Sequence, residues 1–347
     1  MSHELRVGTR GSQLALWQAN AVAARVAQAG GAACRIVVIK TSGDRLQDAP
    51  LSEVGGKRLF VKEIEDALLR GEVDLAVHSS KDMPAVLPEG LAIAAALPRE
   101  DPRDAVVLPV RLTAAAEASP FGSAQSGPEP AESPNHIETV DELVYRLGEA
   151  PSIGTGSVRR IAQLTRLMPG ARFTPIRGNL DTRLRKLDEG AHDALVLASA
   201  GLRRLGFASR ISLPLPASAC VPAPGQGIVA IEIRADDERV RRAMERIDDP
   251  TAAAALTAER ALVEALGGGC QTPVGALATP SDEDMLELVA AVVALDGSRI
   301  VRGELRGPRD RATAIGAELG ARLIADGAAE ILAAAQRAQG VVGGIQP

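Results

Sequence analysis

The stretch that decides the fold is LRVGTRGSQLALWQANAVAARVAQAG, residues 5–30. Its first five residues, LRVGT, predict a strand, and the segment SQLALWQANAVAARVAQAG predicts an amphipathic helix. The short GTRGS turn joins the two, with Ser12 placed to cap the helix. A strand that passes directly into a helix is the unit of parallel and mixed α/β sheets, so the chain opens as an α/β protein.

The same alternation continues along the chain. The runs RIVVIKTSG and VDLAVHSS predict strands, and RLFVKEIEDALLRGE between them predicts a helix. Further on, PSIGTG precedes SVRRIAQLTRLM, ARFTPIRG precedes LDTRLRKLDEG, and DALVLASAG precedes GLRRLG. The turn GTRGS at 8–12 recurs as GTGS at 154–157, again between a strand and a helix. The repeat predicts two similar α/β lobes with mixed sheets and a cleft between them.

The pattern changes after about residue 246. A helix, TAAAALTAERALVEAL, is followed by the strand-like runs TPVGALA, MLELVAAVVAL and RIVRGEL and by one helix to the C-terminus, which predicts a small α+β domain. We expect this third domain to comprise residues 246–347. Before it, the Pro-, Gly- and Ser-rich interval of about 111–137 is expected to be a flexible insertion.

Composition excludes several classes of function. The net charge of −5 and the 2% aromatic content disfavour nucleic-acid binding. No apolar run approaches the length of about 20 residues that spans a membrane, and the N-terminal MSHELRVGTRG has no signal-peptide core, so we expect a cytoplasmic protein. The three cysteines form no CxxC pair and the four histidines are scattered, which predicts neither a disulfide framework nor a metal site.

Arginines follow the ends of several predicted strands. The 39 lysines and arginines include only five lysines, at 40, 57, 62, 81 and 186, which leaves 34 arginines. If Ser157 caps its helix, Arg159 and Arg160 lie in the first turn, where a cation opposes the helix dipole by about 0.3–1 kcal/mol. An anion bound at the helix start would offset that cost, whereas the alternative is a solvated pair of arginines. Equivalent places hold Arg10, Arg177, Arg183, Arg203 and Arg204, which together indicate a polyanionic ligand.

Two further residues carry candidate chemistry. Asp82 follows the strand VDLAVHSS and either accepts a turn hydrogen bond or stabilises positive charge in a reaction. Cys270 follows three glycines in LGGGCQTPVG, residues 266–275, where the thiol can reach outward. Cys34 and Cys220 lie in the apolar runs RIVVIK and SACVPAP and are predicted to pack in the interior.

These motifs resemble the porphobilinogen deaminase (hydroxymethylbilane synthase) family. The matching stretches occur in the family's order over most of residues 5–310: GTRGSQLALWQ, GGKRLFVKEIEDALL, DLAVHSSKDMP, REDPRDA, GTGSVRR, IRGNLDTRL, LASAGLRRLG, PAPGQG and TAERALVEALGGGCQTPVGA. The resemblance implies two lobes like those of periplasmic binding proteins and a monomeric enzyme. It places residues 1–97 and 228–245 in domain 1 and residues 98–227 in domain 2, which contains the insertion. It implies that four porphobilinogen units are joined head to tail with release of ammonia. A dipyrromethane cofactor, one per chain, would be bound through a thioether to Cys270.

The resemblance also assigns roles residue by residue. Asp82 matches the catalytic aspartate, and no metal is implied. The positions that match cofactor contacts are Ser79, Lys81, Thr155, Ser157, Arg159, Arg160, Arg183 and Arg204. Those that match substrate contacts are Arg10, Ser12, Gln18, Arg177, Asn179 and Gln226. The chain departs from the pattern at Gly156, where many members have serine, so one hydroxyl contact is absent.

Two alternatives remain open on the sequence. A non-catalytic, two-lobed anion-binding protein would account for the arginines but would give Cys270 and Asp82 no role. A thiol enzyme with Cys270 as its nucleophile would need a histidine nearby, and no histidine follows His192 in the chain.

Overall fold

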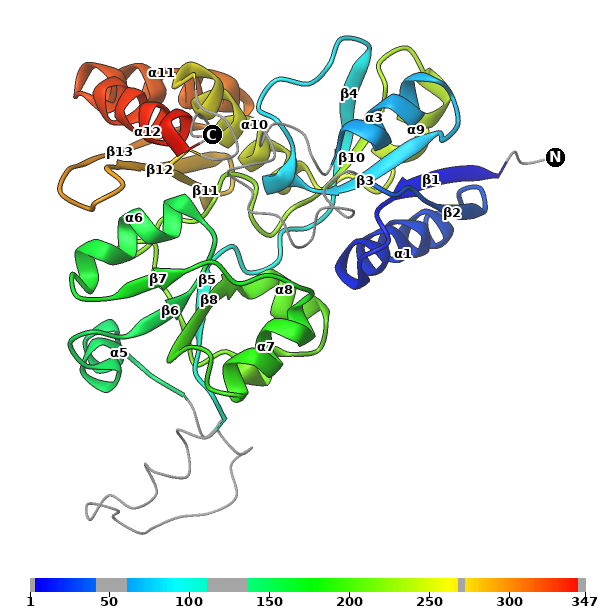
Figure 1. Cartoon of the computed structure of the whole chain (residues 1–347). Helices are drawn as coiled ribbons and strands as arrows, with labels where there is room; N and C mark the ends of the chain where they lie inside the picture. The colour runs from blue at the N-terminus through cyan, green and yellow to red at the C-terminus, as the bar shows by residue number, and fades with distance from the viewer. Residues whose placement is uncertain (1–3, 42–60, 111–135, 268–271, 343–347) are drawn as a thin grey trace.

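The computed structural model describes residues 4–41, 61–110, 136–267 and 272–342, with side chains up to residue 338. These residues form three β-sheets with helices packed against them (Figure 1). Two sheets have five strands each and belong to two α/β lobes, and the third has three strands. The fold class predicted from the sequence is confirmed. None of the described helices is both long enough and apolar enough to cross a bilayer.

Lobe 1 is built on a sheet with the strand order β2-β1-β3-β10-β4. The strands β1, β2 and β3 run parallel, and β10 is antiparallel to both of its neighbours. Helices α1 and α9 cover one face and α3 the other. The elements are β1 (Leu5–Thr9), α1 (Gln13–Gln28), β2 (Cys34–Val38), α3 (Lys62–Leu69), β3 (Leu75–Ser79), the 3-10 turn η1 (Ser80–Asp82), β4 (Leu91–Ala96), β10 (Val229–Arg234) and α9 (Glu238–Glu245).

Lobe 2 repeats this topology, with the strand order β7-β6-β8-β5-β9. Here β6 runs parallel to β7 and β8, and β5 is antiparallel to its neighbours. Helices α5 and α6 cover one face and α7 and α8 the other. The elements are β5 (Asp104–Val107), α5 (Val140–Leu147), β6 (Ser152–Gly154), α6 (Val158–Leu167), β7 (Arg172–Thr174), α7 (Leu180–Asp188), β8 (Ala194–Ala198), α8 (Ser199–Arg204), η2 (Ala208–Arg210) and β9 (Leu213–Pro214).

The chain passes twice between the lobes. Residues 97–103 lead from β4 of lobe 1 into β5 of lobe 2, and residues 215–228 lead from β9 of lobe 2 into β10 of lobe 1. The two crossings touch, because Glu100 N donates to Gly227 O at 3.1 Å. Gly227 has φ +88°, and a Cβ there would lie 2.3 Å from Glu100 O, so only glycine fits. The crossings therefore form one narrow, hydrogen-bonded connection.

The expected insertion of about 111–137 extends too far. Residues 111–135 lie outside the described residues, but Ile137 is fully buried in lobe 2. Its backbone N donates to Ser212 O at 2.9 Å. By Ile137 the chain is therefore already part of the core.

The third domain is an antiparallel sheet, β11-β12-β13, packed against helices. Its three predicted strands are confirmed, whereas the single C-terminal helix is wrong. The chain turns at Gly327, which has φ +97°, and so two helices form in place of one. The elements are α10 (Pro250–Ala265), β11 (Val274–Asp282), β12 (Met285–Val293), β13 (Ile300–Pro308), η3 (Arg309–Arg311), α11 (Ala312–Ala325) and α12 (Ala328–Val342).

This domain packs against both lobes. On the lobe 1 side, Ala252 and Leu256 of α10 join Met83 and Ala96 in an apolar cluster. On the lobe 2 side, the sheet packs against α6 through a cluster formed by Ala162, Val221, Leu277, Ala291 and Val293. Met83 directly follows Asp82, and α6 carries Arg159 and Arg160, so the third domain supports the elements that bear predicted site residues.

A buried carboxylate on α10 joins the third domain to both crossings. Glu259 is fully buried, and its Oε1 accepts hydrogen bonds from Arg99 Nη1 at 2.6 Å and from Ala278 N at 2.7 Å. Its Oε2 accepts from Gly225 N at 2.5 Å. Arg99 lies in the first crossing and Gly225 in the second, so one side chain fixes the third domain to the connection between the lobes.

Candidate active site

The predicted site residues come from strand ends in both lobes. Asp82 of lobe 1 lies close enough to Arg183 of lobe 2 for its negative charge to favour the charged form of the Arg183 guanidinium. Lys81 of lobe 1 is likewise close to charged groups of lobe 2, because Arg160 lowers its pKa and Asp104 raises it. The structure therefore brings these sequence-distant groups together across the space between the lobes, as expected for the edge of an open α/β sheet.

On the lobe 1 side, η1 follows β3 directly and delivers Lys81 and Asp82. Ser79, the last residue of β3, is held by the buried Gln18 of α1, whose Nε2 donates to Ser79 Oγ at 2.8 Å. Ser12 caps α1 as predicted, because its Oγ accepts from Ala15 N at 3.3 Å. A small cavity of about 70 Å³ is lined by Arg10, Ser12, Gln18, Ser79 and Asp82 among others.

Asp82 is exposed, and no described residue donates a hydrogen bond to its carboxylate. The interpretation of Asp82 as a turn cap therefore finds no donor in the described part of the chain. Its carboxylate lies at the rim of the cavity and beside two cations, Lys81 and Arg183.

On the lobe 2 side, Ser157 caps α6 as predicted, with its Oγ accepting from Arg160 N at 3.5 Å. The alternative of solvated arginines is wrong, because Arg159 and Arg160 are only 4% and 9% exposed. Both guanidinium groups converge on the carboxylate of Asp104. Arg159 Nη1 lies 2.6 Å from Asp104 Oδ2, and Arg160 Nε lies 2.9 Å from Asp104 Oδ1.

Asp104 is the first residue of β5 and is fully buried. Burial alone would raise its pKa, but the guanidinium groups of Arg159 and Arg160 outweigh burial and hold the pKa well below its usual range. The thiol of Cys220 also donates to Asp104 Oδ2, at 3.4 Å. Burial, reinforced by Asp104, raises the pKa of Cys220 to about 12, so this thiol stays protonated.

Sequence reasoning missed Asp104. The sequence feature that could have revealed it is an acidic residue at the start of the apolar run DAVV, because a carboxylate buried with such a strand requires a cationic partner. The consecutive arginines of GTGSVRR were the available cations.

Gln226 links this cluster to Lys81. It is fully buried in the second crossing, and its Nε2 donates to Pro102 O at 2.7 Å and to Asp104 Oδ1 at 2.9 Å. Its Oε1 accepts from Lys81 Nζ at 3.4 Å. Lys81 is half-buried, and burial lowers its pKa to about 8, with the Asp82 carboxylate acting in the opposite direction.

Two half-buried arginines of lobe 2 form no ion pair with a carboxylate of the described residues. Arg183 Nε donates to Gly178 O at 2.8 Å, and burial lowers the pKa of Arg183 with help from Arg160 and Arg177. Arg204 Nη2 donates to Gly227 O at 2.6 Å. Such cations are suited to bind the carboxylates of a ligand.

The other predicted residues occupy local positions around this space. Thr155 is buried, and its Oγ1 accepts from Ser157 N at 3.3 Å. Asn179 is exposed at the N-cap of α7, and its side chain makes no capping hydrogen bond. Gly156 is exposed, and a Cβ there would meet no atom within 4 Å, so a serine would fit at this position.

Cys270 lies outside the described residues, which end at Gly267 and resume at Thr272. The packing predicted for the other two cysteines is confirmed: Cys220 lies in the core of lobe 2, and Cys34 packs against the core of lobe 1. Among the described residues, no three His, Cys, Asp or Glu side chains are grouped so that they could hold a metal ion.

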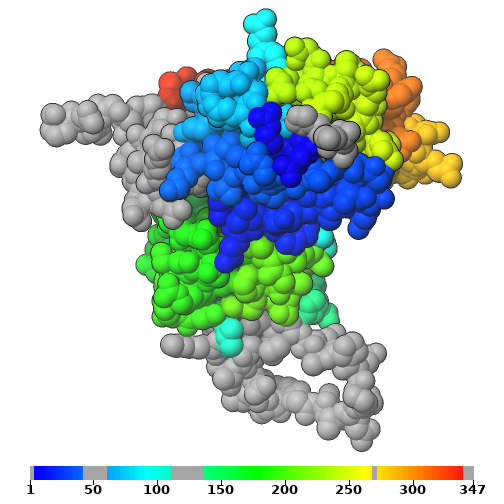
Figure 2. All heavy atoms as spheres, turned by 90° about the vertical axis from the view of Figure 1, so that its right-hand side faces the viewer, coloured from blue at the N-terminus to red at the C-terminus, as the bar shows by residue number. Residues whose placement is uncertain are grey.

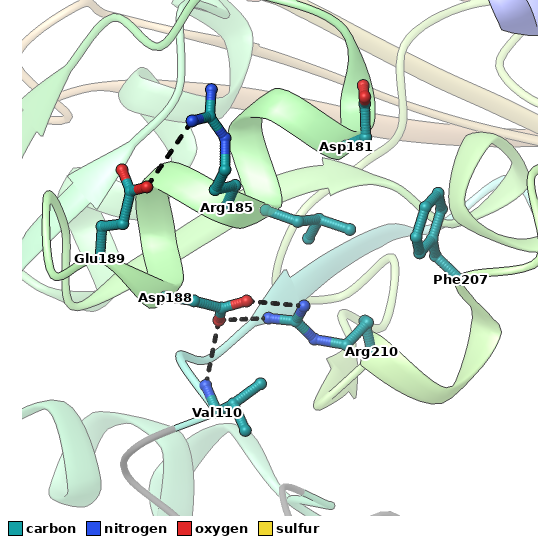
Figure 3. Close-up of a pocket in the computed structure, with 8 residues that line it drawn as sticks. Val110, Asp181, Arg185, Asp188, Glu189, Phe207 and Arg210 are labelled. Carbon is teal, nitrogen blue, oxygen red and sulfur yellow. Dashed lines mark hydrogen bonds and ion pairs between the residues drawn. The ribbon is translucent and has the colours of Figure 1, made fainter.

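A larger cavity, of about 560 Å³, lies elsewhere in lobe 2, between α7 and η2 (Figure 3). Its two arginines are both paired. Arg210 Nη2 lies 2.7 Å from Asp188 Oδ1, and Arg185 Nη1 lies 3.7 Å from Glu189 Oε1. Although it is the larger of the two cavities, it contains none of the predicted site residues, and its cations already have counter-ions.

The fold and the site define a two-lobed α/β protein in which half-buried cations and the Asp82 carboxylate gather between the lobes. Family models match two parts of the chain: "Porphobilinogen deaminase, dipyromethane cofactor binding domain" over residues 5–242, and "Porphobilinogen deaminase, C-terminal domain" over residues 253–325. The chain belongs to the porphobilinogen deaminase family.

Relatives named porphobilinogen deaminase match nearly the whole chain. The protein of Geobacter metallireducens is 44% identical, over 95% of this chain and 94% of its own length. That of Syntrophobacter fumaroxidans is 42% identical, over 96% and 98%. Among solved structures, an ancestral cationic amino acid solute-binding protein covers 70% of this chain and 86% of its own, with a TM-score of 0.38 and 14% identity, a similarity too weak to argue from.

The family's cofactor, dipyrromethane, fits the residues present. It bears acetate and propionate groups, and the described residues offer half-buried cations without a carboxylate partner at Arg183 and Arg204. Lys81, held by Gln226, adds a third cation on the lobe 1 side.

The Asp104 cluster leads to a stability prediction. Asp104→Asn would leave two buried guanidinium groups without their counter-ion, and we expect a loss of about 3–5 kcal/mol in the free energy of unfolding, measured by urea denaturation at pH 7. Because the pKa is lowered in the folded state, this contribution is complete above about pH 4 and is lost only as the pH falls further.

The control is Asp236→Asn, at an exposed carboxylate after β10, which should change stability by less than about 0.5 kcal/mol. An Asp104→Asn protein as stable as the wild type would show that the cluster does not anchor lobe 2.

Proposed function

We propose that this chain joins four porphobilinogen molecules head to tail and releases one ammonia for each unit. Water then cleaves the product from the primer as the linear tetrapyrrole hydroxymethylbilane, so the chain acts as a transferase of tetrapyrrole biosynthesis. The observation that carries the proposal is the position of Asp82. Its exposed carboxylate lines a small cavity together with Arg10 and Ser12, and it lies beside Lys81 and Arg183. A non-catalytic anion-binding protein would use the cations, but a carboxylate among them would weaken the binding of an anion.

We assign the family's dipyrromethane to this space, attached to Cys270. When bound, it supplies the pyrrole to which the first substrate unit is joined. We propose that its carboxylates are held by Lys81 and Arg183, with the hydroxyl groups of Ser79, Thr155 and Ser157 nearby. Arg204, which lies over Trp17 and donates to Gly227 O, takes a pyrrole carboxylate only when substrate units are added. Arg159 and Arg160 contribute by keeping the start of α6 positive, because two guanidinium groups share the single carboxylate of Asp104.

The substrate carboxylates are assigned to the remaining predicted contacts. Arg10 and Ser12 line the cavity beside Asp82, and Arg177 lies near Arg183. Gln18 and Gln226 act indirectly, because their side-chain amides are engaged with Ser79 and Lys81. Asn179 is available at the start of α7.

In the reaction, the bond between the aminomethyl carbon and its nitrogen breaks, and ammonia leaves. The lone pair of the pyrrole nitrogen supports the departure, so positive charge develops on the ring and its N–H. The Asp82 carboxylate would accept a hydrogen bond from that N–H and stabilise the cation. After the new carbon–carbon bond has formed, the attacking ring must lose a proton, and we assign the acceptance of that proton to Asp82.

We further propose the domain limits given by the chain crossings: residues 1–97 with 228–245, residues 98–227, and residues 246–347. The support is that β10 completes the sheet of lobe 1 after the chain has built lobe 2. We also propose a monomeric, cytoplasmic protein without a nucleic-acid partner, in keeping with the net charge of −5.

The role of Asp82 is tested by removing its charge while keeping its shape. Asp82→Asn should fold like the wild type yet lose about 10²-fold or more in porphobilinogen turnover, as expected for one preorganised electrostatic group. Asp82→Glu keeps the charge at a shifted position and should retain more activity than the asparagine variant.

Asp181→Asn is the matched control, since Asp181 is an exposed carboxylate in the first turn of α7 and lines the other cavity. Equal turnover by Asp82→Asn and wild type, measured as porphobilinogen consumed, would contradict the assignment.

Lys81 leads to a pH prediction. Its amine is cationic below a pKa of about 8 and neutral above it, so a carboxylate held by Lys81 is released as the pH rises through that value. We expect kcat/KM for porphobilinogen to fall above about pH 8 in the wild type. Lys81→Arg keeps its charge at every pH tested, and its profile should lack this falling limb even where overall activity is lower. Identical profile shapes for the two proteins would refute the role of the amine.

A further inference from the structure

Besides the two crossings, the lobes touch through a pair of helices, α1 of lobe 1 and α8 of lobe 2. In Figure 2 the dark blue residues of lobe 1 lie directly on the green residues of lobe 2. A Cβ added at Gly201 would lie 3.8 Å from Leu14 Cδ2, and Arg204 Cζ lies 5.5 Å from the centroid of the Trp17 ring. Leu14 and Trp17 are three residues apart on α1, as are Gly201 and Arg204 on α8, so two matched pairs form this contact.

Arg204 is held by lobe 1 and by the second crossing between the lobes. Its guanidinium lies over Trp17 of lobe 1, and its Nη2 donates to Gly227 O in the second crossing at 2.6 Å. No carboxylate of the described residues forms an ion pair with it. The neighbouring Arg203 is different, since it is exposed and lies 3.5 Å from Asp101 Oδ2.

An indole face attracts a guanidinium without neutralising it. A carboxylate that reaches Arg204 can form charge-assisted hydrogen bonds, which are stronger than a contact with an aromatic face. Trp17 is 41% exposed, so the contact lies where a ligand can compete for the cation.

We propose that Trp17 is a positioning residue. Its indole holds the Arg204 guanidinium between the lobes until a carboxylate of bound porphobilinogen takes that cation, and the exchange frees α8 from α1. The inference rests on the proposed function, which places carboxylate-bearing pyrroles between the lobes. It assigns Trp17 no contact with the reacting atoms.

Trp17 reports on this contact directly, because it is the only tryptophan of the chain. The protein carrying its cofactor is titrated with porphobilinogen, the tryptophan emission is recorded, and the substrate units held per chain are counted by intact mass. We expect the emission to change as units are added. Unloaded Arg204→Ala should already show the emission of the loaded wild type.

Arg203→Ala is the matched control, since it removes the adjacent arginine that does not contact the indole, and it should respond like the wild type. An emission that stays constant in the wild type at every loading would overturn the proposal. So would an unloaded Arg204→Ala protein with the emission of the unloaded wild type.

A second pair of variants separates positioning from packing. Trp17→Phe keeps an aromatic face, whereas Trp17→Leu keeps only apolar volume. When substrate is limiting, Trp17→Leu should raise the ratio of more heavily loaded to less heavily loaded chains by about 2- to 10-fold, the range expected for loss of a cation–π contact. Trp17→Phe should raise this ratio less. A purely structural role would lower the melting temperature of both variants and leave the distribution unchanged.

Failure of the proposed function can be distinguished from failure of the role proposed for Trp17. If the wild type takes up no substrate units at all, the proposed function fails. If units are added while the tryptophan emission of the wild type stays constant and the Trp17 variants are loaded like the wild type, only the role of Trp17 fails.

Discussion

The site depends on one buried interaction, the carboxylate of Asp104 between Arg159 and Arg160. A helix that begins with two cations is unfavourable unless an anion compensates them, and here β5 supplies that anion from the protein itself. Because two guanidinium groups share one carboxylate, the start of α6 keeps a net positive charge. The interaction therefore joins α6 to β5 within lobe 2 and leaves the start of α6 with the positive charge that the proposed binding of carboxylates requires. Gln226 extends it to Lys81 of lobe 1.

The third domain depends on a second buried carboxylate, that of Glu259. It binds Arg99 of the first crossing and Gly225 of the second, so the helix α10 is fixed where the lobes are joined. The same helix ends at Ala265, shortly before the glycines that precede Cys270. A group attached to Cys270, as proposed, would therefore join the chain shortly after a helix whose position is set by the crossings.

Local features could be predicted from the sequence, and long-range pairings could not. The caps Ser12 and Ser157 follow from short-range chemistry, as do the strand–helix turns and the three strands of the last domain. The strands β4, β5, β9 and β10, which flank the crossings, were missed because they interrupt the alternation of strand and helix, and their partners lie far along the chain. The Asp104 cluster and the contact of Trp17 with Arg204 escaped for the same reason. Gly327 split the last helix although its flanks have helical composition.

The most direct test of the account is the intact mass of the purified, denatured protein. The account predicts a mass greater than that of the sequence by two pyrrole units, and the mass of the sequence alone for Cys270→Ser. A wild-type protein without added mass, or a Cys270→Ser protein that keeps the full adduct, would contradict it.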